Sequence, residues 1–467
     1  MRRLLAGAPR VPELGSLLPR FGRLMQVGLR VLPYMDDFLV LCDTREMSLE
    51  AREYVDAVLE LLGLSRNASK GVWEPCQVLQ HLGLGVDTKR GLFFVTPERL
   101  EKLRTAGRRL LCRACSNGGQ GLVPVRQLAA FTGLAQSLYL ALPAARLFLR
   151  SLHEAVAAGA AGRARWNGVT RLCSAAKADL QWFVDLQARH NGRAIWRSPQ
   201  TALLHCDASE LAWGAVLNMQ LPARGFWRAH QRREHITLLE LRAVHYAIQA
   251  FLEQLRGRHV LLREDNQAVV AMLKSFTSRS PAIMRELRKL WWLLDVHNVT
   301  LLPRYIRSAA NWYADGLSRA EESGDYRLNP RVFAHLQRLW GPCTIDRFAS
   351  ANNTQLPRFN SAWASPGSSG VDAFAQQDWR RERSFCNPPW ELLDRLAQHL
   401  RETGAQAVVV APHWPAQAWY QQLRSLSSEV LLLPPTPDLF CPGRLGSFEP
   451  IGPPRWPVAC FHIGGSQ

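Results

Sequence analysis

Four carboxylates between residues 203 and 319 constrain this chain more than any other feature. They are Asp207, Glu240, Asp265 and Asp315. Each lies at the end of a short apolar stretch or close to the start of an amphipathic one. If these stretches pack as strands and helices of one structure, their ends can bring all four carboxylates to one point.

The apolar stretches around these residues predict a sheet with helices. Asp207 follows the first stretch, Asp265 follows the fourth, and Asp315 lies in or before a helix after the last. Five short apolar runs are predicted as strands or extensions of the sheet: 202–206, 213–217, 224–228, 259–263 and 299–302.

An amphipathic helix is predicted from Thr237 onward. We expect Thr237 to be the N-cap, with Glu240 three residues later, as in a capping box. Glu240 lies beside an apolar stripe near the start of this helix. The stripe has helical spacing and consists of Leu238, Leu241, Val244, Ile248 and Phe251 or Leu252.

Clustered carboxylates repel one another, and each resists ionising in the presence of the others. Divalent cations remove that repulsion. Two ions about 4 Å apart can activate a water molecule and stabilise the leaving oxygen of a phosphodiester. The alternative interpretation, a solvated cap or surface charge, suits any one of the four carboxylates better than it suits four in this order.

The same residues carry a resemblance to a known family. Asp-Ala-Ser at 207–209, Leu-Glu-Leu-Arg-Ala at 239–243, Asp-Asn at 265–266 and the run from Asn311 to Arg319 resemble the ribonuclease H domain of retroelement polyproteins. The resemblance implies that the four acidic residues bind two Mg²⁺ ions and that the RNA strand of an RNA–DNA hybrid is cut. Many relatives have a histidine shortly before the last Asp, where this chain has residues 305–308, so the resemblance does not extend to histidine-assisted product release.

A second resemblance lies near the amino terminus. Two apolar strands flank Tyr34-Met35-Asp36-Asp37, which resembles the catalytic hairpin of reverse transcriptases. The resemblance implies that Asp36 is a magnesium ligand and that Asp37 supports it, although Asp is also a common turn residue. Residues 64–70 resemble the lysine-bearing loop of that family, and 80–95 the hairpin that grips the primer end. No strand ending in Asp precedes Tyr34, so we expect only the C-terminal half of a polymerase and no primer extension.

Helices are expected between this part and the carboxylates. By position they match the thumb or connection of a reverse transcriptase, and a generic helical spacer is the alternative. The four expected helices cover about 97–115, 124–140, 141–158 and 168–189.

A third pattern follows the polar linker at 321–325. A short strand runs into Asn387-Pro388-Pro389-Trp390, which resembles the catalytic motif of amino-methylating DNA methyltransferases. The resemblance implies that the Asn387 side chain and a proline carbonyl accept hydrogen bonds from an adenine amino group, while Trp390 stacks on a flipped-out base. The alternative is a rigid Pro-Pro turn packed by Trp390.

The same resemblance implies a cofactor. S-adenosylmethionine would be the methyl donor, and Asp346 and Asp372 are the expected contacts for it. Neither residue is followed by a clear glycine-rich loop. An active methyltransferase and a degenerate one therefore both remain open.

Composition supports a nucleic-acid partner. The 467 residues carry a net charge of +18 and have a pI of about 10.0, which RNA–DNA hybrid or DNA would balance through phosphate contacts. Nearly all of the basic residues are Arg, so GC-rich coding is an alternative cause of the high positive charge.

The ten Cys are scattered, and Cys112 with Cys115 suits one face of a helix better than a metal site. No transmembrane stretch or signal peptide is evident, so we expect no membrane partner and an intracellular protein, cytoplasmic or nuclear and not secreted. The sequence does not indicate the oligomeric state.

The order of the three patterns resembles the polyprotein of DIRS-type tyrosine-recombinase retroelements. The predicted class is multidomain, α/β and α+β. The predicted parts are a partial palm at 1–96, a helical thumb or connection at 97–198, a ribonuclease H-like mixed sheet with helices at 199–322, and an α/β methyltransferase-like domain at 323–467. The predicted function is magnesium-dependent hydrolysis of RNA in hybrids. The alternatives are an inactive nucleic-acid-binding remnant and a DNA adenine methyltransferase-type modifier.

Overall fold

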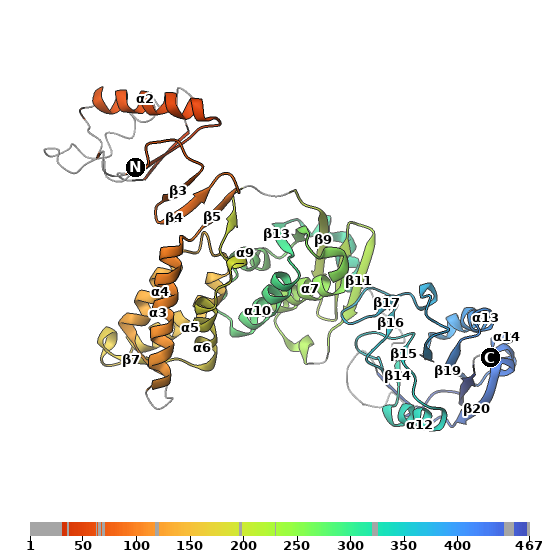
Figure 1. Cartoon of the computed structure of the whole chain (residues 1–467). Coiled ribbons are helices and arrows are strands. Elements are labelled where there is room, and N and C mark those ends of the chain that lie inside the picture. Colours follow the sequence, from red (N-terminus) through yellow and green to blue (C-terminus); the bar gives the residue numbers. More distant parts are fainter. Residues whose placement is uncertain are drawn as a thin grey trace. The chain divides into compact units, whose positions relative to one another are not determined.

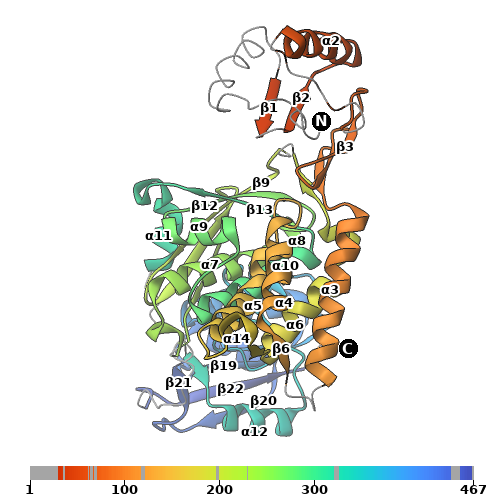
Figure 2. The same cartoon turned by 90° about the vertical axis from the view of Figure 1, so that its left-hand side faces the viewer.

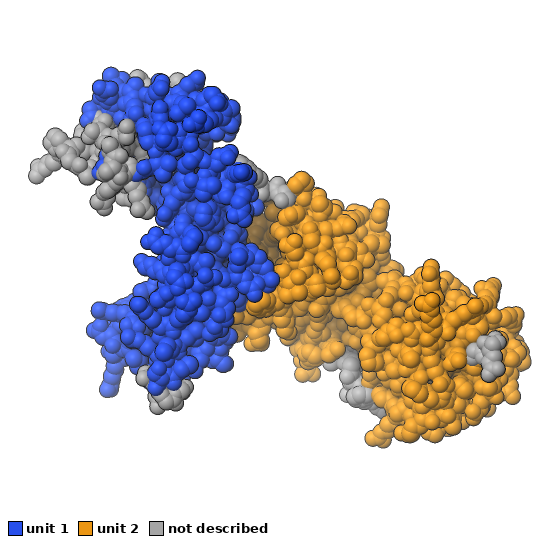
Figure 3. All heavy atoms as spheres, viewed as in Figure 1, with its two compact units in different colours: residues 1–197 blue, residues 198–467 orange. Residues whose placement is uncertain are grey.

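A computed structural model shows the fold (Figure 1). It describes residues 30–34, 37–61, 63, 67, 71–116, 121–195, 199–228, 230–319, 326–442 and 453–464. The chain forms two compact units, residues 1–197 and 198–467 (Figure 3). Both contain helices packed with sheets, so the predicted multidomain mixed α/β class is confirmed. No described helix is long and apolar enough to cross a membrane.

The first unit combines small antiparallel sheets with a group of helices. The strand order of its largest sheet is β3-β4-β5-β8. Its elements are β1 (Arg30–Tyr34), β2 (Asp37–Leu41), α2 (Arg45–Leu61), β3 (Val78–His81), β4 (Leu84–Asp87), β5 (Leu92–Phe94), α3 (Pro97–Ser116), β6 (Leu122–Pro124), α4 (Val125–Ser137), α5 (Ala145–Ala160), η2 (Arg165–Asn167), β7 (Val169–Arg171), α6 (Ser174–Val184), η3 (Ala188–His190) and β8 (Arg193–Ala194).

Aromatic packing between α4, α5 and α6 builds the core of the first unit. Phe148 stacks on Trp182 with ring centroids 4.1 Å apart, and Phe131 meets Phe183 edge to face at 5.5 Å. The four expected helices are present as α3 to α6. The last two begin later than predicted, at Ala145 and Ser174, and β7 occupies part of the stretch before α6.

The second unit begins with a five-stranded sheet and its helices. These elements are β9 (Ala202–Ala208), β10 (Ala212–Leu217), β11 (Leu221–Phe226), η4 (Gln231–Arg233), α7 (Ile236–Ala250), α8 (Leu252–Leu255), β12 (His259–Glu264), α9 (Gln267–Ser275), α10 (Pro281–Val296), β13 (Thr300–Tyr305), η5 (Ser308–Asn311) and α11 (Trp312–Arg319). All five predicted strands are confirmed.

The sheet has the order β11-β10-β9-β12-β13. Figure 1 labels β9, β11 and β13 of this sheet, and Figure 2 labels β9, β12 and β13. β9, β10 and β11 are antiparallel neighbours, whereas β9, β12 and β13 run parallel. α7 and α11 both pack against β9, which explains why nearly every residue of that strand is buried. The carboxyl ends of β9, β12 and β13 therefore lie along one edge of the sheet.

The start of α7 differs from the prediction. The N-cap is His235, whose ring nitrogen Nδ1 accepts a hydrogen bond from the Thr237 amide at 3.2 Å. Thr237 as N-cap and the capping box were wrong, because Glu240 turns toward the sheet and not back to the helix start. The predicted apolar stripe is confirmed by the burial of Leu238, Leu241, Val244, Ile248 and Phe251.

A second sheet follows, with the order β15-β18-β19-β22-β20. Its first three strands are parallel and β22 is antiparallel to both neighbours. The elements after α11 are β14 (Tyr326–Leu328), α12 (Pro330–Trp340), β15 (Ile345–Asp346), β16 (Asn360–Ser361), β17 (Gly370–Val371), η6 (Ala373–Ala375), β18 (Arg383–Cys386), η7 (Trp390–Leu392), α13 (Leu393–Thr403), β19 (Gln406–Pro412), α14 (Ala418–Leu426), β20 (Ser427–Leu433), β21 (Phe440–Pro442) and β22 (Val458–Ile463).

The two sheets of the second unit are joined at β11. The Asn352 side-chain amide donates to the Phe226 carbonyl at 2.8 Å, and Ala223 forms an isolated parallel bridge with Ala364. The boundary predicted between residues 322 and 323 remains a prediction, because residues 320–325 lie outside those that the structure describes.

The close approach of α11 to β10 gives a stability prediction. A Cβ added at Gly214 would lie 2.6 Å from the Ala314 carbonyl oxygen and 2.6 Å from the Leu317 Cβ. Gly214→Ala should therefore push α11 off the sheet and lower the free energy of unfolding by about 1–3 kcal/mol. Gly316→Ala on the same helix meets open space and should raise it by about 0.5–1 kcal/mol. Chemical denaturation measures both, and effects of equal sign would contradict the packing.

Candidate metal centre

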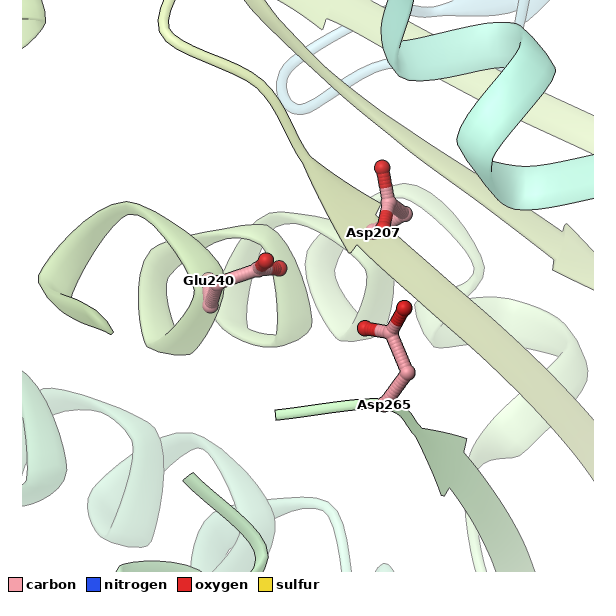
Figure 4. Close-up of side chains that lie close together, drawn as sticks. All are labelled: Asp207, Glu240 and Asp265. Atoms are coloured by element: carbon pink, nitrogen blue, oxygen red, sulfur yellow. The ribbon is translucent and has the colours of Figure 1, made fainter. Parts of the chain in front are cut away.

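Three carboxylates converge at the carboxyl edge of the first sheet. Asp207 lies inside β9, Glu240 projects from α7, and Asp265 follows the last residue of β12. Figure 4 shows the three side chains pointing toward one another from these separate elements. One oxygen of each lies within 4.8 Å of the others.

The donor set fits a divalent cation. Asp207 and Glu240 are buried and Asp265 is half-buried, so the cluster is open on one side. Glu240 Oε2 is buried and has no hydrogen-bond partner among the described residues. An orphaned carboxylate oxygen beside two further carboxylates is an arrangement that Mg²⁺ would complete, since hard cations prefer oxygen ligands.

Residues of η5 and α11 hold Asp207 in place. The Ser318 hydroxyl donates to Asp207 Oδ2. The buried Asn311 side chain donates from Nδ2 to the Cys206 carbonyl at 2.8 Å, and its Oδ1 lies 3.3 Å from Nδ1 of His205. These bonds join α11 to Asp207 itself and η5 to the two residues before it, so both elements position the carboxylate.

Asp315 lies outside the tight cluster. Its Oδ1 pairs with Nε of Arg319 at 2.6 Å, and its side chain is 33% exposed. Its negative charge nonetheless contributes to raising the pKa of Asp207 and of Glu240. Three of the four predicted carboxylates are therefore brought together, and the fourth stands beside them in an ion pair.

Glu264 is a further carboxylate of the site that the sequence did not lead us to expect. It is fully buried, and its Oε1 accepts from the Asn266 amide at 3.2 Å while Oε2 has no partner among the described residues. Burial, followed by the charge of Glu240, raises its pKa well above the ordinary value. The alternation of buried Val260, Leu262 and Glu264 along β12 is the signal that could have found it.

Burial and mutual repulsion make the cluster resist ionisation. Burial, and then the charges of Asp265 and Asp315, raise the pKa of Asp207 to about 6, against the hydrogen bond from Ser318. Burial, and then the charges of Asp207 and Asp265, raise the pKa of Glu240 to about 9. A bound cation would reverse both effects, because it stabilises the ionised forms.

The predicted polymerase hairpin is described only in part. β1 pairs with β2 in antiparallel register, with Tyr34 opposite Asp37. Asp37 is half-buried at the start of β2, while Met35 and Asp36 lie outside the described residues. The proposed magnesium role of Asp36 and Asp37 therefore stays a prediction.

The Asn387 motif lies at the carboxyl end of β18, the second parallel strand of the second sheet. Asn387 Nδ2 donates to the Tyr326 carbonyl at 3.4 Å, Pro388 is buried, and Pro389 is exposed. Trp390 is 41% exposed and packs edge to face against Trp414 and Trp456. The motif is thus a packed turn with an accessible aromatic face.

The two expected cofactor contacts do not form a matched pair. Asp346 is buried at the end of β15, accepts from the backbone amides of Gln355 and Phe348, and has a pKa raised by burial to about 7. Asp372 caps the Phe374 amide at 3.0 Å and lies 3.8 Å from Arg395. Both carboxylates make contacts within the described residues, and their predicted roles toward S-adenosylmethionine stay predictions.

Comparison with known proteins gives only distant likenesses. No protein-family model and no curated protein matches the chain. The foamy viral protease-reverse transcriptase in complex with RNA/DNA hybrid is 15% identical over 69% of this chain and 40% of that chain, with a TM-score of 0.32. The same viral enzyme in complex with double-stranded DNA is 14% identical over 64% of this chain and 60% of that chain, with a TM-score of 0.34. Ribonuclease H1 from Halobacterium salinarum NRC-1 is 20% identical over 25% of this chain and 91% of that chain, with a TM-score of 0.22.

The chain spans 40% and 60% of the length of the two foamy viral chains. Likeness at these identities and TM-scores does not decide what the carboxylates do.

The raised pKa values predict how pH and Mg²⁺ act together on stability. Below about pH 4 the Asp207 and Glu240 carboxyls are protonated in both the folded and the unfolded chain, so their raised pKa values do not lower the free energy of unfolding. Stability is lost as pH rises from about 4 to about 6 for Asp207 and from about 4 to about 9 for Glu240, because the unfolded chain ionises in these ranges while the folded chain still holds the protons. For Asp207 the loss is on the order of 3 kcal/mol, at about 1.4 kcal/mol per pKa unit.

Mg²⁺ needs the ionised carboxylates and should therefore raise Tm more at pH 8 than at pH 5. Thermal melts with and without Mg²⁺ at both pH values measure this difference. In Asp207→Asn the loss of stability between about pH 4 and about pH 6 should be smaller than in the native chain. Equal Mg²⁺ shifts at both pH values would show that these carboxylates are not the ligands.

Proposed function

We propose that this chain is a ribonuclease H-type endonuclease of a retroelement polyprotein, which hydrolyses the RNA strand of RNA–DNA hybrids with two Mg²⁺ ions. The observation that supports this is the convergence of Asp207, Glu240 and Asp265 within 4.8 Å, from a strand, a helix and a strand end. The order of the residues along the chain and the mixed sheet that carries them support the same function.

Each residue has a distinct part in this proposal. Asp207, Glu240 and Asp265 would hold the metal ions, and Asp315 would join them from the rim. When bound, the ions would supply the activation of water and the stabilisation of the leaving oxygen. The Ser318 hydroxyl orients Asp207. Because Asp265 is only half-buried, the cluster is open to a phosphodiester on that side.

The proposal includes a DIRS-type origin and a polymerase part. What supports these is the order of three patterns along the chain: the hairpin at 30–41, the carboxylates at 207–315 and the motif at 387–390. RNA–DNA hybrid and DNA are the proposed partners, and the net charge of +18 favours such polyanions.

A second candidate function concerns the second sheet. We propose that it is a methyltransferase-like module that binds a nucleobase and lacks the methyl donor. Ligands of open α/β sheets bind at the carboxyl ends of parallel strands, which is where Asn387 lies. The Asn387 side-chain oxygen, the atom that would accept from an amino group, has no hydrogen bond to any described residue.

Substitution of one ligand tests the first proposal. Asp265→Asn should lower Mg²⁺-dependent cleavage of an RNA–DNA hybrid more than about 100-fold, because even partners of metal ligands cost 10–100-fold when mutated. Glu253→Gln is the matched control, since Glu253 is an exposed carboxylate on α8 that pairs with Arg256. Hybrid binding by Asp265→Asn should remain. A wild-type chain that binds hybrid but does not cut it would identify the inactive remnant instead.

The second candidate predicts binding without transfer. A DNA duplex with one unpaired adenine should bind more weakly to Asn387→Ala than to the native chain, by about fivefold for one lost hydrogen bond of about 1 kcal/mol. Isothermal titration with S-adenosylmethionine should show no binding. Methyl transfer to adenine would instead establish an active methyltransferase, and an unchanged affinity in Asn387→Ala would leave the motif a structural turn.

A further inference from the structure

An exposed group of aromatic and basic side chains stands beside the carboxylate cluster. We define the crossover surface as Tyr305, Arg307, Trp312 and Arg319. Trp312 is 63% exposed and Tyr305 is 46% exposed, while the Arg319 side chain is 72% exposed. Exposed aromatic rings and arginines are the side chains that pack on bases and contact the phosphates of nucleic acid.

The backbone places this surface at the same sheet edge as the carboxylates. Tyr305 is the last residue of β13 and lies opposite Glu264, the residue before Asp265. The Ile306 amide then donates to the Glu264 carbonyl at 3.0 Å. From there the chain passes through η5, which Asn311 ties to β9, and enters α11 at Trp312.

Helix geometry aligns the rest of the surface with the fourth carboxylate. Trp312, Asp315 and Arg319 are spaced three and four residues apart, so they share one face of α11. The Trp312 ring stacks on Tyr313 with centroids 5.2 Å apart and planes 11° from parallel, which restrains its orientation. A braced aromatic ring and a guanidinium therefore flank Asp315 on its own helix.

The charges explain why the site needs such a flank. The substrate of the proposed function is a polyanion, and the carboxylates themselves offer it no positive charge. Arg307 and Arg319 supply positive charge at the rim, where phosphates adjoining the cut would pass. Among the described residues Arg319 bonds Asp315 through Nε alone, and its side chain is 72% exposed, so its terminal nitrogens can contact a phosphate.

We infer that the crossover surface binds the sugar-phosphate backbone of the strand whose phosphodiester lies at the carboxylates, with Trp312 packing on a sugar or base and Arg319 contacting a phosphate. This rests on the proposed ribonuclease H-type function for the identity of the substrate. Trp312 is a substrate-contacting residue in this arrangement, and it takes no part in the bond-breaking step.

Equilibrium binding to a fluorescently labelled RNA–DNA hybrid tests the inference, with the full chain carrying Asp265→Asn so that the hybrid stays intact. Adding Trp312→Ala should weaken binding about tenfold, in line with aromatic contacts to nucleic acid, and leave the salt dependence unchanged. Adding Arg319→Ala should lower the slope of log affinity against log salt by about one. Trp312→Phe should restore most of the affinity.

Trp292→Ala is the matched control, because Trp292 is a 44% exposed tryptophan on another helix, α10. Its affinity for the hybrid should stay that of the parent, and Tm should be unchanged in every variant. In the cleaving chain, Trp312→Ala should raise KM and leave kcat nearly constant. Equal losses in Trp312→Ala and Trp292→Ala, or no loss in Trp312→Ala, would overturn the assignment.

Failure of the proposed function has a different signature. If the native chain does not cut hybrid with Mg²⁺, yet Trp312→Ala and Arg319→Ala weaken binding as described, the crossover surface stands and the nuclease assignment falls. If the native chain cuts hybrid and neither variant changes KM or affinity, the nuclease assignment stands and the surface falls.

Discussion

Electrostatic repulsion between buried carboxylates is the constraint on which the second unit depends. Asp207, Glu240 and Asp265 meet within 4.8 Å, and Glu264 lies buried immediately next to Asp265. The carboxylates of such a cluster repel one another and tend to move apart unless protons or cations neutralise them. The fold resists dispersal by anchoring each carboxylate on an element whose position is set by apolar packing: β9 between α7 and α11, α7 through its buried stripe, and β12 at the centre of the parallel strands.

The elements of this sheet could be predicted from the sequence because periodicity reports burial directly. Short apolar runs predicted all five strands, and helical spacing predicted the buried face of α7. The details at element ends were less predictable, because they depend on tertiary contacts. His235 caps α7 in place of Thr237, and Asp207 lies within β9 and not after it, since β10 continues the pairing as far as Ala208.

The site was predictable only as far as residue type and order define it. Asp207, Glu240 and Asp265 meet as expected. Asp315 pairs with Arg319 on its own helix and does not join the cluster. The spacing of residues in the sequence does not show which of these two contacts forms. Glu264 was missed because a charged residue just before a predicted ligand resembles the solvated end of a strand. Alternate residues of β12 are buried, and this alternation includes Glu264. In the second sheet the position of Asn387 after a strand was predicted, whereas the hydrogen bonds of Asp346 to two backbone amides depend on tertiary contacts that the sequence pattern does not specify.

The parallel pairing of β9 with β12 and β13 also has a consequence for how the site forms in time. Parallel strands must be joined by long crossovers, so their contacts span large separations in sequence and form slowly. The carboxylates come from both ends of this stretch, from Asp207 to Asp315, and Asn311 must reach back to Cys206 to close it. A nascent chain would therefore form strands and helices of this unit well before its carboxylates come together at one point. Cation binding is thereby delayed to the last stage of folding.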